Sequence, residues 1–244
     1  MRIVGVIPAR YDSSRYPGKP LADIQGKPMI QHVYERSLKA SRLDRLVVAT
    51  DDARILNAVE RLGGEALLTR SDHPSGTDRV AEAAGLLGLG EDDVLINIQG
   101  DEPLVEAVMI ERLIEAMEQP PECPMATLAF SSRNEADYRS VNVVKVVVDE
   151  AGKALYFSRS PLPYRRDGSD EPLSFLKHLG FYGYRHSFLK TFTRLAPGKL
   201  ESLEKLEQLR ALEHGYSIRV ALSPVETHGV DTLEDLRRLT GLAR

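Results

Sequence analysis

The chain has 244 residues, 42% of them hydrophobic and 28% charged, which is typical of a globular protein with a sizeable core and not of a disordered or fibrous one. The formal net charge of −4 gives no support for binding to DNA or RNA. The single cysteine, Cys123, excludes an intrachain disulfide and favours a reducing compartment.

Residues 1–8 form a short apolar run with one positive side chain. This run lacks the length and the cleavage site of a signal peptide. No apolar stretch in the chain approaches the roughly 20 residues that a membrane span needs. We therefore expect a cytoplasmic protein that binds neither membranes nor nucleic acid.

Short apolar runs alternate with amphipathic segments through the first half of the chain. The runs predict buried strands at 3–7, 46–49 and 94–98, and further strands at 66–68 and 126–130. The amphipathic segments predict helices at 28–40, 52–62, 76–87 and 106–118. This order predicts an α/β fold with a doubly wound, mostly parallel, Rossmann-like sheet and helices on both faces.

The second half of the chain has a different pattern. Two apolar runs flank a glycine-containing turn and predict a hairpin, a polar loop follows, and a further strand and two helices complete the chain. These elements are the strands 143–148 and 155–158, the loop 164–172, the strand 178–185, and the helices 202–214 and 232–242. No repeat or linker interrupts the chain, so we expect one domain, 1–244, with a hairpin-rich insertion at about 140–187.

The loop 8–20 follows the first predicted strand and carries Arg10, Arg15 and Lys19. Ligands of doubly wound sheets bind at the carboxyl ends of strands, and guanidinium and ammonium groups suit phosphate oxygens. The loop lacks P-loop spacing, and the chain has no G-x-G-x-x-G fingerprint of a dinucleotide oxidoreductase. A solvated basic loop is the alternative, but the position after a buried strand favours triphosphate binding.

Two acidic residues are candidate magnesium ligands. Asp101 follows the predicted strand 94–98, where nucleotide phosphates would lie, and Gly100 before it permits a close approach of the backbone. Asp231 directly precedes the last predicted helix. The alternatives are a tight turn with a solvated Asp101, and an Asp231 that only favours the positive helix end.

Residues 73–79 open a helix, where Ser75 either reads a base or phosphate or simply caps the helix. No Ser-His-Asp or Cys-His arrangement and no zinc spacing is visible.

The polar residues His178, Tyr182 and Tyr184 alternate with apolar ones on one predicted strand, so they share a face. This face could line a sugar pocket or belong to an ordinary amphipathic strand. Glu207 and Gln208 lie on a leucine-rich predicted helix, where a solvated face is the ordinary interpretation.

Taken together, these motifs resemble the CMP-KDO synthetases, which are 3-deoxy-manno-octulosonate cytidylyltransferases. The resemblance covers essentially the whole chain in order. It is carried by Pro8-Ala9-Arg10, Ser14-Arg15, Pro17-Gly18-Lys19-Pro20, Ser75-Gly76-Thr77-Asp78-Arg79, Gln99-Gly100-Asp101-Glu102-Pro103 and Gly229-Val230-Asp231-Thr232, and by the segments 26–30, 48–51, 144–147, 154–159, 178–185 and 206–210. Tyr16 stands where the family usually has Leu, and Leu233 where it often has Pro; both lie beside the implied contacts.

The resemblance implies a role for each candidate residue. Phosphate handling falls to Arg10, Arg15 and Lys19, with Arg15 shared with the sugar acid, and magnesium binding falls to Asp101 and Asp231; these five form the implied catalytic set. The implied nucleotide-binding residues are Pro8, Ala9, Arg10, Lys19, Ser75, Gly76, Arg79 and Gln99. The implied sugar-binding residues are Arg15, Arg159, His178, Tyr182, Tyr184, Glu207 and Gln208. The resemblance also implies a homodimer.

The implied reaction joins CTP to an eight-carbon sugar acid. The anomeric hydroxyl attacks the α-phosphorus of CTP, and pyrophosphate leaves in line. Magnesium on Asp101 and Asp231 would organise the triphosphate and lower the pKa of the hydroxyl.

Other functions remain open at this stage. The nearest is a cytidylyltransferase for another acidic sugar, such as a sialic acid or an amino-substituted octulosonate. A glycosyltransferase with a similar sheet would release a nucleoside diphosphate instead of pyrophosphate. A non-catalytic nucleotide-binding regulator would bind CTP without turnover. The fold alone does not choose among them.

Overall fold

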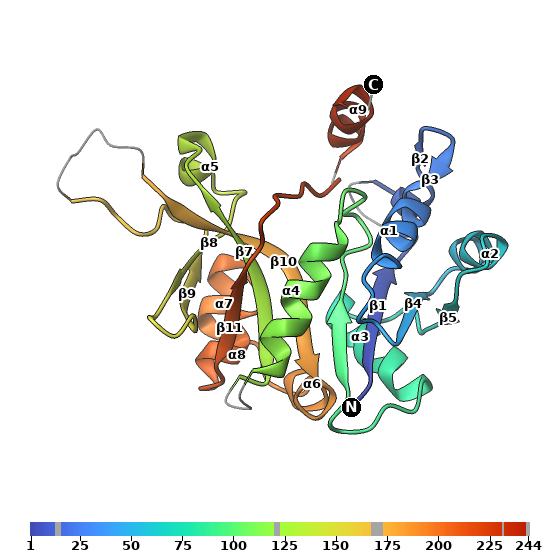
Figure 1. Cartoon of the computed structure of the whole chain (residues 1–244), viewed down its shortest axis with the longest axis horizontal. Coiled ribbons are helices and arrows are strands. Elements are labelled where there is room, and N and C mark those ends of the chain that lie inside the picture. The colour runs from blue at the N-terminus through green and yellow to red at the C-terminus, as the bar shows by residue number, and fades with distance from the viewer. Residues whose placement is uncertain (13–15, 120–122, 167–172, 231, 243–244) are drawn as a thin grey trace.

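The computed structural model describes residues 1–12, 16–119, 123–166, 173–230 and 232–242. Within these ranges the chain forms a nine-stranded mixed sheet with helices on both faces (Figure 1). The main path of the sheet has the order β11-β7-β10-β6-β1-β4-β5, and β8 and β9 join it beside β10. The strands are β1 (Ile3–Ala9), β4 (Arg45–Thr50), β5 (Ala66–Leu68), β6 (Val94–Asn97), β7 (Met125–Ser132), β8 (Lys145–Val148), β9 (Ala154–Ser158), β10 (Phe175–Arg185) and β11 (Ile218–Leu222).

The remaining elements are mostly helices on the two faces of this sheet. They are η1 (Lys19–Leu21), α1 (Met29–Ser37), α2 (Ala53–Arg61), α3 (Gly76–Leu86), α4 (Ala107–Glu118), α5 (Glu135–Arg139), α6 (His186–Phe192), α7 (Lys199–Glu204), α8 (Leu209–Glu213) and α9 (Leu233–Leu242), with the short β2 (Asp23–Ile24) and β3 (Lys27–Pro28) before α1. In the described part of the chain, no helix has both the length and the apolar character needed to cross a bilayer.

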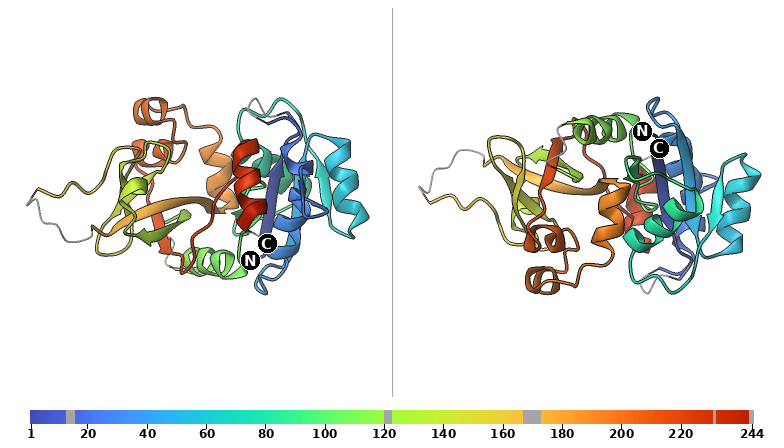
Figure 2. Two further views of the ribbon diagram at one scale, coloured as in Figure 1. Left: turned by 90° about the horizontal axis from the view of Figure 1, so that it is seen from above. Right: turned by 90° about the horizontal axis from the view of Figure 1, so that it is seen from below.

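The alternation of side chains along the strands builds a separate core on each face. In β1, Ile3 and Ile7 point to one face, and Val4 and Val6 to the other. Apolar residues of α1, α2 and α4 cover the first face, and those of α3, α6 and α8 cover the second. Figure 2 shows α4 in green and the α7–α8 segment in orange on opposite sides of the sheet. The predicted doubly wound architecture is therefore confirmed.

The direction of β10 makes the sheet mixed. β1 pairs in parallel with β4 and β6, and β7 pairs in parallel with β11. β10 lies antiparallel between β6 and β7, and also pairs with β8. The predicted hairpin forms as β8 and β9, within the predicted insertion, and it extends the same sheet through β10.

The prediction of one helix at 202–214 is wrong. The chain forms α7, ends it at Lys205 in the left-handed conformation with φ 55°, and begins α8 at Leu209. Leu206, in the connection, and Leu209, in α8, are both buried in the second core, so the leucine-rich segment packs against that core without forming one continuous helix. Glu207 and Gln208 consequently lie between two short helices and not along the face of one.

Three side-chain caps fix the helix starts near the carboxyl edge of the sheet and in the hairpin region. Asp52 accepts a hydrogen bond from the Arg54 amide, Ser75 from the Asp78 amide, and Asn134 from the Ala136 amide. The C-terminal α9 packs through Leu236 and Leu239 against Ala22, Ile24 and Met29. Segments from the two ends of the chain thus meet above the end of β1 (Figure 1).

Candidate active site

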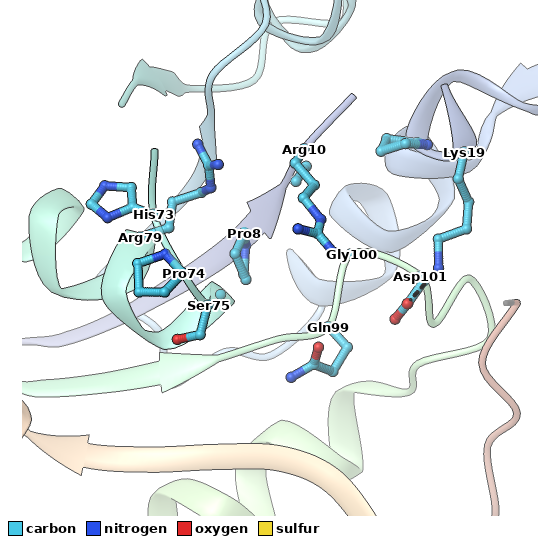
Figure 3. A pocket seen from close by; sticks show the side chains of 13 residues that line it. Pro8, Arg10, Lys19, His73, Pro74, Ser75, Arg79, Gln99, Gly100 and Asp101 are labelled. Carbon is cyan, nitrogen blue, oxygen red and sulfur yellow. Dashed lines mark hydrogen bonds and ion pairs between the residues drawn. The ribbon is translucent and has the colours of Figure 1, made fainter. Parts of the chain in front are cut away.

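A cavity of about 240 Å³ opens where β1 and β6 end and α3 begins (Figure 3). The structure brings together at this cavity every described residue for which the sequence predicts nucleotide binding, together with the predicted metal ligand Asp101. The cavity is lined by Pro8, Ala9, Arg10, Lys19, Pro20, His73, Pro74, Ser75, Gly76, Arg79, Gln99, Gly100 and Asp101. Two predicted catalytic residues, Arg15 and Asp231, lie outside the described residues.

The loop after β1 turns back on itself and brings Lys19 to the rim of the cavity. Gly18 adopts φ 73°, and its amide donates to the carbonyl of Tyr11 at 2.8 Å. A Cβ at Gly18 would meet the Tyr11 ring at 3.2 Å, so the turn needs glycine for both its dihedral angle and its space. Lys19 Nζ then lies 2.7 Å from Asp101 Oδ2, across the cavity rim.

The loop after β6 lies against β1. A Cβ built on Gly100 would be 2.8 Å from the carbonyl oxygen of Pro8, so the close approach at this glycine is to the neighbouring strand. Gln99 on one side of it donates through Nε2 to the carbonyl of Gly180 at 2.7 Å. Asp101 on the other side carries the carboxylate that meets Lys19.

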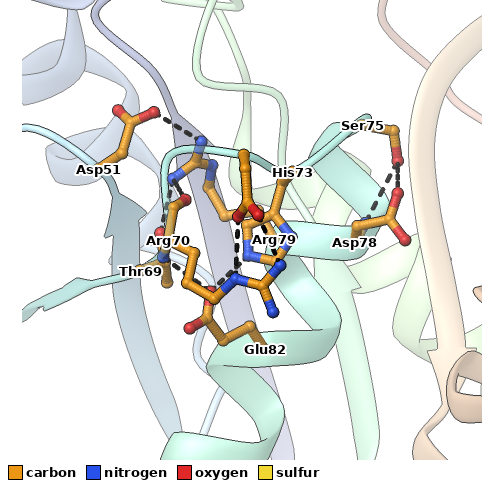
Figure 4. A network of polar contacts seen from close by, with 9 residues as sticks. Asp51, Thr69, Arg70, His73, Ser75, Asp78, Arg79 and Glu82 are labelled. Carbon is orange, nitrogen blue, oxygen red and sulfur yellow. Dashed lines mark hydrogen bonds and ion pairs between the residues drawn. The ribbon is translucent and has the colours of Figure 1, made fainter.

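The start of α3 forms the opposite wall and is held by a network of ionic contacts (Figure 4). The Arg79 side chain is only 4% exposed; its guanidinium donates to Thr69 Oγ1 at 2.6 Å and meets Asp51 at 2.9 Å. His73 contacts Glu82, one turn along α3 from Asp78. Arg79 therefore fixes the wall, and the contact to cytidine implied for it by the resemblance stays a prediction.

The predicted sugar-binding residues of β10 form a row of rings on one face. The centroids of His178 and Tyr182 are 5.6 Å apart, and those of Tyr182 and Tyr184 are 6.0 Å apart. Burial lowers the pKa of His178 to about 3 and raises the pKa of Tyr182 well above its ordinary value. All three side chains are therefore neutral at pH 7. Tyr184 is fully buried, and its hydroxyl has no hydrogen-bond partner in the described structure.

The segment between α7 and α8 completes this row. Glu207 accepts a hydrogen bond from Thr77 Oγ1 at 2.5 Å, and burial raises the pKa of its carboxyl group. Gln208 is 3% exposed, and its Nε2 finds no partner among the described residues. An unpaired buried donor suits a polar ligand or a bound water.

Arg159 directly follows strand β9 of the hairpin. It follows Phe157, whose ring packs edge-on against His178 with centroids 5.0 Å apart. The Arg159 guanidinium donates to the carbonyl oxygens of Glu204 at 2.7 Å and Val141 at 3.0 Å. These contacts fix its direction, and its role toward a sugar acid stays a prediction.

Two hydrogen bonds join the cavity to the ring row. Gln99, which lines the cavity, reaches Gly180 between His178 and Tyr182. Thr77, next to the cavity residue Gly76, reaches Glu207. Hydrogen bonds therefore join the segments that carry the two groups of predicted residues; that these groups bind a nucleotide and a second substrate stays a prediction.

The residues at the rim fit a magnesium ion bound together with phosphates. The Asp101 side chain is 33% exposed at the cavity and offers carboxylate oxygens, which are the ligands that Mg²⁺ prefers. No cluster of three or more His, Cys, Asp or Glu side chains occurs within the described ranges. A site with one protein carboxylate suits Mg²⁺, which usually keeps water and substrate phosphates in its coordination shell.

Sequence analysis gave no role to two residues that hold the site together, although both lie in segments that carry the resemblance. Asp51 directly follows the buried strand β4, which was a usable signal for its position at the carboxyl edge of the sheet. Thr77 carried no such signal, because its partner Glu207 lies 130 residues away and the intervening fold brings them together.

The fold and the site define an α/β nucleotidyltransferase-type protein: a cavity of about 240 Å³ at the carboxyl edge of the sheet, with cations, a carboxylate and a helix N-terminus around it. Comparison with known proteins gives the particular family. The chain belongs to the cytidylyltransferase family, whose model matches residues 4–218.

Individual relatives agree with this family. The chain is 69% identical to 3-deoxy-manno-octulosonate cytidylyltransferase of Syntrophobacter fumaroxidans, over 97% of this chain and 94% of that protein. It is 53% identical to 8-amino-3,8-dideoxy-manno-octulosonate cytidylyltransferase of Shewanella halifaxensis, over 97% of this chain and 96% of that protein. A solved structure of CMP:2-keto-3-deoxy-manno-octonic acid synthetase complexed with CTP is 45% identical, with a TM-score of 0.92, and the match covers 100% of this chain and 98% of that one.

Proposed function

We propose that the protein transfers the cytidylyl group of CTP to the anomeric hydroxyl of 3-deoxy-D-manno-octulosonate (KDO). The products would be CMP-KDO, an activated sugar for lipopolysaccharide synthesis, and pyrophosphate. The observation that carries this proposal is that hydrogen bonds of Gln99 and Thr77 join the cationic cavity to the segments that carry the predicted sugar-binding residues. The 69% identity to a protein named for this reaction supports the choice of both substrates.

The cavity supplies what a nucleoside triphosphate requires. Arg10 and Lys19 bring positive charge to one side, and the first turn of α3 offers backbone amides around Ser75 and Gly76 on the other. Since the walls are held by Arg79–Asp51 and Lys19–Asp101, the donors are in position before the ligand arrives. We expect a pyrimidine base beside Ser75, Gly76 and Gln99, where a purine would be too large.

The chemistry follows from the placement of the two substrates. The anomeric oxygen of the sugar acid forms a bond to the α-phosphorus, the bond from that phosphorus to the bridging oxygen breaks, and pyrophosphate leaves with the electron pair. The hydroxyl proton passes to solvent or to a base at the site. Lys19 and Arg10 would stabilise the charge that develops on the departing pyrophosphate.

Magnesium is part of this proposal. Asp101 would hold the ion, with Asp231 as the predicted second ligand, and the bound ion would neutralise phosphate charge and acidify the attacking hydroxyl. Asp101→Asn should impair both magnesium-dependent CTP binding and turnover. Asp231→Asn should leave CTP binding nearly intact and reduce turnover by orders of magnitude. Calorimetric CTP titration beside pyrophosphate release measures both effects, and normal turnover by Asp231→Asn would refute its metal role.

One assay tests the function as a whole. The full chain is incubated with Mg²⁺, each of CTP, UTP, ATP and GTP, and a panel of KDO, the 8-amino-3,8-dideoxy sugar and a sialic acid. Pyrophosphate release should require CTP and KDO. Faster turnover of the 8-amino sugar, for which the Shewanella halifaxensis relative is named, would reassign the acceptor. A nucleoside diphosphate product, or CTP binding without turnover of any sugar, would refute the proposed reaction.

The site of action and the assembly are proposals as well. We propose a cytoplasmic homodimer. The resemblance to the CMP-KDO synthetases implies the homodimer, and a single buried cysteine suits a reducing compartment. Sedimentation of the full chain across a concentration series tests the dimer.

A further inference from the structure

A β-bulge in β10 separates His178 from Tyr182. In the pairing of β10 with β7, Leu179 stands opposite Leu128, and the next pair is Tyr182 with Thr127. Gly180 and Phe181 therefore face no residue of β7, and β10 bends where the ring row meets the loop of Gln99.

The Thr127 side chain fills this bulge. It is fully buried, and its Oγ1 lies 2.8 Å from the carbonyl oxygen of Phe181 and 3.3 Å from that of Leu179. A third neighbour, His178 Nε2, lies 2.9 Å from the same oxygen. One hydroxyl group thus contacts two backbone acceptors and one ring nitrogen.

The number of protons decides the direction of these contacts. A hydroxyl has one proton, and carbonyl oxygens can only accept. If the hydroxyl donated to His178, its lone pairs would face two buried carbonyl oxygens with no proton between them, which is costly in a buried site. The hydroxyl therefore donates to Phe181, and His178 Nε2 donates to the hydroxyl oxygen.

The other ring nitrogen follows from this assignment. Burial lowers the pKa of His178 to about 3, so the ring is neutral at pH 7 and carries one N–H. With Nε2 protonated, Nδ1 keeps its lone pair and is an acceptor. The rings of Phe157 and Tyr182, with centroids 5.0 and 5.6 Å from that of His178, hold the ring plane in place.

We propose that Thr127 is a positioning residue that fixes His178 in its Nε2–H form, so that Nδ1 accepts a hydrogen bond from a hydroxyl or amino group of the sugar acid. This inference rests on the proposed function for the identity of the ligand. It also makes a statement on specificity: the lone pair of Nδ1 would repel the sugar carboxylate, so that carboxylate must bind to a cation elsewhere in the site. His178 therefore reads a donor group of the sugar and not its charge.

Two variants separate the hydroxyl of Thr127 from its shape. Thr127→Val keeps the volume of the side chain and removes the hydroxyl, and Thr127→Ser keeps the hydroxyl. The first readout is long-range ¹H–¹⁵N NMR of the full chain with ¹⁵N-labelled histidine, in which the His178 signals are assigned by their loss in His178→Gln. Wild type and Thr127→Ser should show protonated Nε2 and unprotonated Nδ1 at pH 7, and Thr127→Val should lose this single tautomer.

The second readout is steady-state kinetics with KDO. Thr127→Val should raise the KM for the sugar about 10-fold, the loss expected for one buried hydrogen bond, while Thr127→Ser restores most of it. The KM for CTP should stay within about twofold in both variants, since Thr127 does not line the nucleotide cavity. Deoxy analogues of the sugar locate the donor group. The analogue that lacks this group should bind wild type more weakly than KDO does, and Thr127→Val should bind that analogue no more weakly than wild type does.

The NMR result is independent of turnover, so the inference and the proposed function can fail separately. A wild-type ring protonated at Nδ1, or doubly protonated at pH 7, would overturn the inference even if KDO is the substrate. Unchanged KM for the sugar in Thr127→Val would also overturn it. If Thr127→Val fails to bind CTP, the spectra of wild type and Thr127→Ser still decide the tautomer.

Discussion

Gly100 lies between β6 and the loop that carries Asp101, and an added methyl group there has no space. Its Cβ would lie 2.8 Å from the Pro8 carbonyl oxygen and 3.5 Å from Cγ2 of Ile7. Non-bonded carbon atoms prefer separations of roughly 3.5–4.0 Å, so Gly100→Ala must push the loop away from β1 by about half an ångström or more. The atom that it meets belongs to the backbone of Pro8, which is paired in parallel with β4, and it cannot rotate aside.

The expected effects are on both stability and activity. Overpacking of this kind costs about 1–3 kcal/mol, which corresponds to a melting temperature lower by roughly 2–12 °C in a chain of this size. Because Gln99 and Asp101 move with the loop, kcat/KM for CTP should fall by about 10- to 100-fold at a temperature where the variant is folded.

A matched substitution controls for the methyl group itself. Gly85 is exposed within α3 and has nothing within 4 Å of its ideal Cβ, so Gly85→Ala should leave activity unchanged and add up to about 1 kcal/mol of stability. Thermal unfolding and pyrophosphate release are measured for both variants. Wild-type kcat/KM and melting temperature in Gly100→Ala would refute the argument that the site depends on this close approach.

Three further substitutions test single contacts. Asp93 accepts hydrogen bonds from the Arg2 and Gly90 amides and from the Arg2 side chain, which lower its pKa to about 2. The carboxylate therefore stabilises the folded state fully at pH values above the ordinary pKa near 4, and this stabilisation is lost as the pH falls through about 2. Asp93→Asn should cost about 2 kcal/mol in urea unfolding at pH 7, with a deficit that shrinks in acid, and a constant deficit would contradict the linkage. Lys145 is fully buried and donates to the carbonyl oxygens of Ser140, Val143 and Arg159. Lys145→Met should therefore lower the free energy of unfolding by roughly 1–3 kcal/mol in the same assay. Wild-type stability of this variant would show that the three acceptors find other donors. Lys19→Ala should lower kcat/KM for CTP by about 10- to 100-fold with little change in melting temperature, and an unchanged value would reduce Lys19 to a partner of Asp101.

Local patterns were sufficient to predict the architecture and which loops meet at the carboxyl edge of the sheet. The buried runs at 3–7, 46–49 and 94–98 became β1, β4 and β6, because an unbroken apolar run in an α/β chain has no stable place except a sheet covered on both faces. Parallel strands end at one edge, so the residues that follow β1 and β6 had to meet there. Lys19 and Asp101, 82 residues apart, are in contact for this reason.

Only the tertiary structure decided the other half of the site. β10 lies antiparallel between β6 and β7, and β11, which the sequence analysis did not predict, pairs with β7. Strand order depends on contacts between distant segments, and the local pattern of apolar residues carries no information on those contacts. The helix break at Lys205 could not be predicted, because the leucines that follow it, Leu206 and Leu209, pack into the same core and give the segment the apolar pattern of one helix. The sequence therefore determined which loops lie at the carboxyl edge of the sheet, through the periodic burial of each segment. The folded chain alone determined that Thr77 meets Glu207 and that Thr127 meets His178, because hydrogen bonds between distant segments exist only after the sheet has assembled.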